Sequence, residues 1–224
     1  MTRPHDMGGR FGDGPVLSEP ETPTFTEEWH ARALAVTLAV GALGQWNIDT
    51  SRHARERLSP KDYARFSYYE KWMAALADLM AEKRVVTKDE LLGEGVEPSA
   101  LSERRLTVDR VAQVLASGAP ADRPGDFPQA FAPGDAVLAR HFAENIDFPG
   151  GHTRLPAYAA GARGRILICH GAHVLPDAAA HGKDDTAEPL YTVAFKASEL
   201  WAHPEHPDDE VMLDLWQSYL SPVP

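Results

Sequence analysis

The chain has 224 residues, of which 43% are hydrophobic and 25% are charged, and its formal net charge is −11. These values are typical of a globular protein with one large domain or two small ones. The acidic balance argues against a protein that binds nucleic acid or lies on an anionic membrane. The single cysteine, Cys169, excludes an internal disulfide and a cysteine-based zinc site.

The first 25 residues are rich in glycine and proline and have almost no apolar periodicity. Such a segment is either a disordered tail or an arm that becomes ordered on a partner. It has no apolar core of the kind found in secretory signals. The longest apolar stretch, 31–43, is too short to span a bilayer of about 30 Å. We therefore expect a cytoplasmic protein.

A helix is predicted over 26–44. Thr26 is a suitable N-cap, two glutamates follow at the positive end of the helix dipole, and Gly41 and Gly44 mark its far end. Apolar residues occur almost all the way round it, which predicts deep burial.

The clearest helix signal begins at Ser59, a good N-cap, with Pro60 at the first helical position and Asp62 placed for a capping box. We expect this helix to run to about Lys83. It carries two apolar stripes, one with Phe66, Tyr69, Met73, Leu76 and Met80 and the other with Tyr68, Trp72 and Leu79. Two stripes predict two packing partners: its own domain on one side, and a cleft or a second subunit on the other.

Shorter helices are predicted at 87–93 and 107–116, and a linker composition over 117–126 marks the best domain boundary. Short strands follow, at 136–140, 164–170, 190–195 and 211–215. Such strands, separated by turn residues, are typical of a small barrel or a sandwich. The predicted class is α+β, with an all-helical first half.

One arginine, Arg154, lies in the Gly/Pro-bounded segment 151–158. A guanidinium is a rigid fork of donors suited to an anionic oxygen pair, but it is neither a nucleophile nor a good base. The sequence has no G-x-S-x-G elbow and no glycine-rich phosphate loop. We expect it to stabilise chemistry whose other half lies on a partner. The basic cluster 52–57 is either a solvated, salt-bridged turn or a second such site, through Arg52.

The ten histidines raise the question of a metal site. Two pairs, His170 with His173 and His203 with His206, are separated by two residues, which is not the helical spacing of an H-E-x-x-H site. We interpret them as surface or structural residues and predict no metal site in this chain. Cys169, which ends an apolar run, is expected to be a buried core thiol.

Several segments match one family in order along the chain: 5–9, 52–56, 68–72, 151–156, 189–193, 199–201 and 214–220. Over essentially its whole length the chain resembles the β subunit of nitrile hydratase. The resemblance implies metal-assisted hydration of a small nitrile to an amide. It also implies a partner α subunit, in an αβ heterodimer or an α2β2 assembly. That partner would hold Co(III) or Fe(III) through a cluster of partly oxidised cysteines.

The resemblance assigns roles to individual residues. The two arginines that the family directs at the oxidised cysteines map onto Arg52 and Arg154. The substrate channel maps onto Ile48, Ser51, Tyr68, Tyr69 and Trp72. The Tyr68 hydroxyl would bond the nitrile nitrogen or the amide, and the indole of Trp72 would form an apolar wall. Tyr69, nearer the core stripe, is equally well explained as a structural residue, and Ser51 stands where family members often carry Phe.

The resemblance also implies four regions: an arm over 1–25 that wraps the α subunit, a helical domain over 26–117, a linker over 118–134 and an SH3-like barrel over 135–224. Two other readings stay open, an activator or metallochaperone of the same family and an SH3-like interaction module without a catalytic role. Thiocyanate hydrolase is a further relative, in which the equivalent of this chain is split in two. The sequence does not distinguish cobalt from iron.

Overall fold

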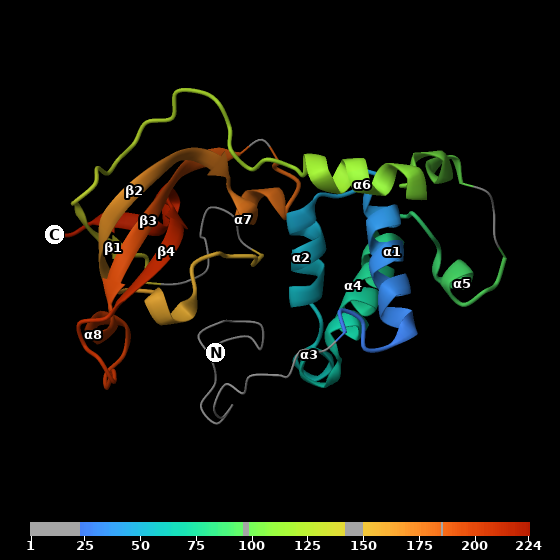
Figure 1. The fold of residues 1–224 in the computed structure, drawn as a ribbon, viewed down its shortest axis with the longest axis horizontal. Coiled ribbons are helices and arrows are strands. Elements are labelled where there is room, and N and C mark those ends of the chain that lie inside the picture. Colours follow the sequence, from blue (N-terminus) through green and yellow to red (C-terminus); the bar gives the residue numbers. More distant parts are fainter. Residues whose placement is uncertain (1–22, 96–98, 142–149, 185) are drawn as a thin grey trace. The chain divides into compact units, whose positions relative to one another are not determined.

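Helices dominate the first half of the chain and strands the second (Figure 1). The computed structural model describes residues 23–95, 99–141, 150–184 and 186–224. It divides into two compact units, one of the described residues up to Ala119 and the other of Pro120–Pro224. The expected order of helices and then strands is confirmed. The expected arm over 1–25 lies almost wholly outside the described residues.

The N-terminal unit is built around one central helix. Its helices are α1 (Glu28–Gly41), α2 (Ile48–Glu56), α3 (Pro60–Arg65), α4 (Tyr68–Glu82), α5 (Lys88–Leu91) and α6 (Val108–Ser117), with a 3-10 helix at Ala100–Arg104. Helix α4 packs against both α1 and α2. Ala54, Ala75 and Leu79 form a buried cluster with Trp46 packed on it.

The single helix expected from Ser59 to Lys83 is wrong, because the chain breaks it into α3 and α4. Phe66 is extended, with φ −74° and ψ 138°, and Ser67 begins the second helix. Ser67 and Glu70 form a capping box in which the Ser67 N–H donates to the Glu70 carboxylate over 2.7 Å. The apolar periodicity continues across the break, so only the cap chemistry marks it.

Helix α2 forms where a basic cluster before a helix was expected. The Asn47 side chain caps it by accepting the Thr50 N–H over 2.7 Å. Its buried residues are Asp49, His53 and Ala54. An apolar periodicity search misses this helix because two of its three buried residues are polar.

The expectation that the first helix is deeply buried is also wrong. Of the residues in α1 only Ala33 is buried, and Val36 is 41% exposed. The main neighbour of α1 among the described elements is α4, which covers one side of it. Several apolar residues of α1 are therefore left uncovered by the described part of the chain.

The C-terminal unit is one antiparallel sheet. Its strands are β1 (Ala136–Ala139), β2 (Arg163–Val174), β3 (Ala187–Lys196), β4 (Glu210–Trp216) and β5 (Leu220–Pro222), in the order β4-β3-β2-β1-β5. Short helices α7 (Pro176–Ala179) and α8 (Ala197–Leu200) and 3-10 turns at Ala157–Ala159 and Gln217–Tyr219 connect them. All four expected strands are confirmed. In the described residues the outer strands β4 and β5 do not pair with each other, so the sheet is not a closed barrel.

The core of this unit lies on one face of the sheet. It is made of buried side chains from β1 to β5 and from the loops that cover them, including Val137, Leu155, Ile166, Tyr191, Phe195, Leu215 and Tyr219. Cys169 packs against this core but is only half-buried, unlike the buried thiol expected. In the part of the chain that the structure describes, no helix is long and apolar enough to cross a membrane.

Candidate functional site

Arg52 lies on α2 and presents its guanidinium to the surface. Its Nη1 donates to Asp49 Oδ1 over 3.3 Å, one turn earlier on the helix. The Arg52 side chain remains 47% exposed, whereas that of Asp49 is 12% exposed. Asp49 therefore orients the arginine without covering it, and the guanidinium keeps donors for an anion.

Arg154 is also exposed, but its backbone is held firmly. Its N–H donates to the Tyr219 hydroxyl over 3.0 Å, and the next residue, Leu155, is 1% exposed in the core of the sheet unit. His152, two residues earlier, is buried and held in the left-handed backbone region at φ 64°. A non-glycine residue at this φ costs roughly 1–2 kcal/mol, so the surrounding contacts determine this turn.

Behind Arg154 lies a buried polar pair. The Tyr219 hydroxyl donates a short hydrogen bond to Asp177 Oδ2, and both side chains are fully buried. Burial raises the pKa of the Asp177 carboxyl to about 6, and the bond from Tyr219 offsets only part of that rise. Burial, followed by the nearby Asp177 charge, raises the pKa of Tyr219. No local pattern in the sequence indicates this pair, because its members lie on a short helix and a 3-10 turn far apart in the chain.

The three predicted aromatic residues come together at the start of α4. The ring centroids of Tyr68 and Trp72 are 5.4 Å apart, and those of Tyr69 and Trp72 are 5.9 Å apart. Tyr68 is 63% exposed, whereas Tyr69 and Trp72 are half-buried. Tyr69 stacks on His30 of α1, with centroids 4.8 Å apart. The contact gives Tyr69 a packing role between two helices, while Tyr68 remains largely exposed.

The predicted channel residues of α2 lie on its first turn and a half. Ile48 is 60% exposed. The Ser51 hydroxyl accepts a hydrogen bond of 3.1 Å from Arg55 Nη2. The guanidinium of Arg55 lies over the Trp72 ring, 4.3 Å from its centroid. Arg55 therefore links the serine to the aromatic group. Sequence reasoning missed it, although the i, i+4 spacing from Ser51 signals the contact once α2 is recognised as a helix.

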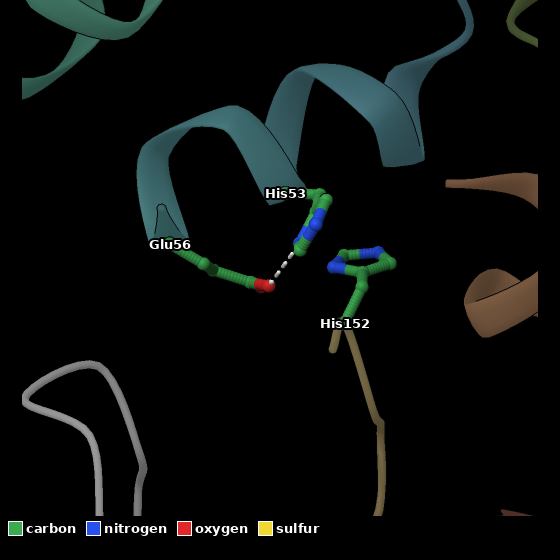
Figure 2. Close-up of side chains that lie close together, drawn as sticks. All are labelled: His53, Glu56 and His152. Carbon is green, nitrogen blue, oxygen red and sulfur yellow. Dashed lines mark hydrogen bonds and ion pairs between the residues drawn. The ribbon is translucent and has the colours of Figure 1, made fainter. Parts of the chain in front are cut away.

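A second pair on α2 was not predicted either. His53 Nδ1 lies 3.3 Å from Glu56 Oε2, and Figure 2 shows the two side chains approaching each other from the same helix. His53 is 7% exposed. A carboxylate beside a buried imidazole fixes the ring orientation. This pair lies on the inward side of α2, whereas Arg52 lies outward.

The histidine pairs considered in the sequence occupy the sheet unit. His170 and His173 lie on β2, where His170 Nε2 is 2.7 Å from Thr192 Oγ1 and His173 Nδ1 is 3.3 Å from the Gly171 carbonyl. His203 and His206 lie in the turn between α8 and β4. The bonds of His170 and His173 are ordinary cross-strand and local contacts.

Comparisons with known proteins cover almost the whole chain. Residues 1–114 match the family model described as "Nitrile hydratase beta subunit, N-terminal", and residues 120–222 match the model described as "Nitrile hydratase beta subunit, C-terminal". The chain is 35% identical to the low-molecular weight cobalt-containing nitrile hydratase subunit beta of Rhodococcus rhodochrous, over 98% of each chain. It is 36% identical to the nitrile hydratase subunit beta of Pseudomonas putida, again over 98% of each.

Two further similarities were found. The cobalt-containing nitrile hydratase subunit beta of Pseudonocardia thermophila is 30% identical, over 100% of this chain and 97% of the relative. Among solved structures, a thiocyanate hydrolase apo-enzyme from Thiobacillus thioparus is 21% identical, with a TM-score of 0.38. That similarity covers 43% of this chain and 78% of the other.

Proposed function

The chain belongs to the family of nitrile hydratase beta subunits, and on this basis we propose that Arg52 and Arg154 hold oxidised cysteine ligands presented by an alpha subunit. Nitrile hydratase converts nitriles to amides, and this chain is its beta subunit. The observation that carries the proposal is a structural feature that Arg52 and Arg154 have in common. Both residues are exposed, and each makes one anchoring contact: Arg52 Nη1 donates to Asp49, and the backbone N–H of Arg154 donates to the Tyr219 hydroxyl.

The residues of this chain do not fit a cysteine-ligated metal. Its single cysteine, Cys169, lies on β2 and packs against the core of the sheet unit. One thiolate is too few for the ligand set that the family implies. We therefore assign the metal, Co(III) or Fe(III), to the alpha subunit. Two of the relatives are named as cobalt-containing.

The chemistry of the arginines suits that partner. Sulfinate and sulfenate groups are anions with fixed oxygen positions, and a guanidinium donates two parallel N–H bonds to such a group. A hydrogen bond to a charged group contributes about 1.5–3 kcal/mol, and more when its loss leaves a charge buried. On this proposal Arg52 and Arg154 keep the sulfur-bound oxygens in one orientation while water adds to the nitrile carbon.

The aromatic group at the start of α4 is the proposed substrate wall. The exposed Tyr68 hydroxyl is placed to donate to the nitrile nitrogen or to accept from the amide product, while Trp72 excludes water. Ile48 and Ser51 extend the wall along α2. Ser51 is smaller than the Phe that family members often carry there, which favours a wider pocket in this enzyme.

The family also supports the finer architecture. We propose that the five strands are part of an SH3-like barrel over 135–224 and that residues 1–25 form an arm on the alpha subunit. The enzyme would then be an αβ heterodimer or an α2β2 assembly. Because these regions match family models end to end, an activator or an isolated interaction module fits the chain less well.

The test is to co-express the chain with its alpha subunit and replace Arg52 or Arg154 by lysine. Lysine keeps the charge but loses the two-pronged geometry. Turnover per metal should fall about 10-fold or more, as expected for about 1.5 kcal/mol or more of lost interaction. Arg57→Lys is the matched control, because Arg57 is an exposed arginine next to α2 that pairs with Glu82. Full turnover of either Lys variant in a metal-loaded heteromer would refute the assignment.

A further inference from the structure

Arg55 is held between a hydroxyl and an aromatic ring. Its Nη2 donates to Ser51 Oγ over 3.1 Å, and its guanidinium carbon lies 4.3 Å from the centroid of the Trp72 ring. The first contact is within α2, and the second joins α2 to α4. One side chain therefore connects two residues of the proposed substrate wall.

The environment of Arg55 strengthens the contact. Arg55 is half-buried, whereas Arg52 and Arg57 nearby are exposed. Burial, the largest cause, lowers the pKa of the Arg55 guanidinium, although the group stays charged at neutral pH. The attraction between a cation and the face of an indole ring is stronger when the cation is partly shielded from water. Of these three arginines, Arg52 pairs with Asp49 and Arg57 with Glu82, while Arg55 is the one placed on an aromatic ring.

The position of Trp72 affects its aromatic neighbours. Its ring centroid is 5.4 Å from that of Tyr68 and 5.9 Å from that of Tyr69. Tyr69 is itself fixed by stacking on His30. Trp72 is thus bounded by Tyr69 on α4 and by Arg55 from α2, and Tyr68 is the member of the group left most exposed.

We propose that Arg55 is a positioning residue that holds the Trp72 indole against α2, and so sets the size of nitrile that the site accepts. This inference rests on the proposed function, in which Tyr68 and Trp72 line the substrate pocket. Without the guanidinium the indole gains freedom to rotate about its side-chain bonds, and the wall no longer has one fixed width. The effect should fall on bulky substrates, since a small nitrile makes few contacts with the wall.

The test uses the complete heteromer and two probes, acetonitrile and benzonitrile. Arg55→Met should change the benzonitrile-to-acetonitrile ratio of kcat/KM by about 5-fold or more, within the range of a partly desolvated cation–π contact. The change should appear mainly in KM for benzonitrile, with kcat for acetonitrile and the metal content unaltered. Arg55→Lys, which keeps a cation over the ring, should largely restore the ratio. Arg57→Met is the matched control and should leave it unaltered.

A double-mutant cycle shows whether Arg55 acts through the indole. In a Trp72→Leu background, Arg55→Met should have no further effect on the ratio. An equal effect in both backgrounds, or an unchanged ratio in Arg55→Met, would overturn the inference. If Arg55→Met fails to assemble, Arg55→Gln replaces it, since it also removes the cation from the Trp72 ring, and it must shift the ratio where Arg55→Lys does not. Should Trp72→Leu and Tyr68→Phe themselves leave both nitriles unaffected, the pocket assignment fails instead.

Discussion

The backbone N–H of Arg154 donates to the phenolic oxygen of Tyr219, which lies 65 residues further along the chain, over 3.0 Å. The same hydroxyl donates to Asp177, and Tyr219 and Asp177 are both fully buried. The segment that carries the exposed arginine is therefore tied to the core of the sheet unit through its backbone. The guanidinium of Arg154 takes no part in this contact, which is made by the backbone N–H.

Tyr219→Phe should lower the free energy of unfolding of the full chain by about 1–3 kcal/mol. The substitution keeps the ring in the core but leaves the Arg154 N–H and the Asp177 carboxyl without the hydroxyl that bonds them. Urea denaturation measures the change. Tyr158→Phe is the control, since it keeps the ring stacked on Trp201 and should change the free energy much less. Equal losses in the two variants would contradict the prediction.

Asp177→Asn should flatten the dependence of stability on pH. The pKa of Asp177 is raised from 3.8 to about 6 in the folded chain, and its Oδ1 is buried with no hydrogen-bond partner among the described residues. The folded state thus binds this proton more tightly than the unfolded state does. The stabilisation is complete below pH 3.8 and is lost as the pH rises through about 6.

The size of this effect follows from the shift. About two pKa units correspond to about 3 kcal/mol. Denaturation curves collected from about pH 4 to pH 7 should show the wild-type chain losing stability relative to the Asn variant as the pH rises. If the difference in free energy of unfolding between the two chains stays constant over this range, Asp177 does not titrate as described.

Gly164→Ala should destabilise the sheet unit by overpacking. A Cβ at this position of β2 would lie 2.5 Å from Val193 Cγ1 and 2.9 Å from Phe195 Cε1, both in the core. Such crowding costs about 1–3 kcal/mol. Gly41→Ala is the control, because a Cβ there meets nothing within 4 Å among the described residues. Thermal unfolding should separate the two variants, and a stable Gly164→Ala chain would rule out the tight packing.

Ser67→Ala should weaken both α4 and substrate binding. Losing this N-cap costs about 1 kcal/mol, and it loosens the turn that carries Tyr68 and Trp72. We expect a lower melting temperature by circular dichroism and a higher KM. Ser59→Ala removes the equivalent cap from α3, where the serine accepts the Asp62 N–H over 3.0 Å. It should lower the melting temperature without changing KM; a KM change of the same size would argue against a local effect of Ser67.

Much of the fold could be predicted from local signals. The predicted starts at Ser59 and Thr87 are true helix starts, and the short stretches separated by turn residues are four of the five strands. The exceptions have tertiary causes. A search for apolar periodicity does not find helix α2, because packing buries polar residues on its inner face. Strand β5 is three residues long and ends in proline, so it exists only because β1 offers it an edge.

The sequence by itself determined the family, and through that resemblance it predicted the two arginines and the aromatic residues of the proposed pocket, because each lies in a short segment whose residue types and order along the chain are recognisable. Only the tertiary structure decided what supports them. Arg55 meets Trp72 because α2 packs on α4, and Tyr219 meets Arg154 because the last 3-10 turn brings its hydroxyl to the backbone N–H of Arg154. Neither contact follows from spacing in the chain, since packing between elements is set by the shapes of their buried faces and not by the residues that connect them.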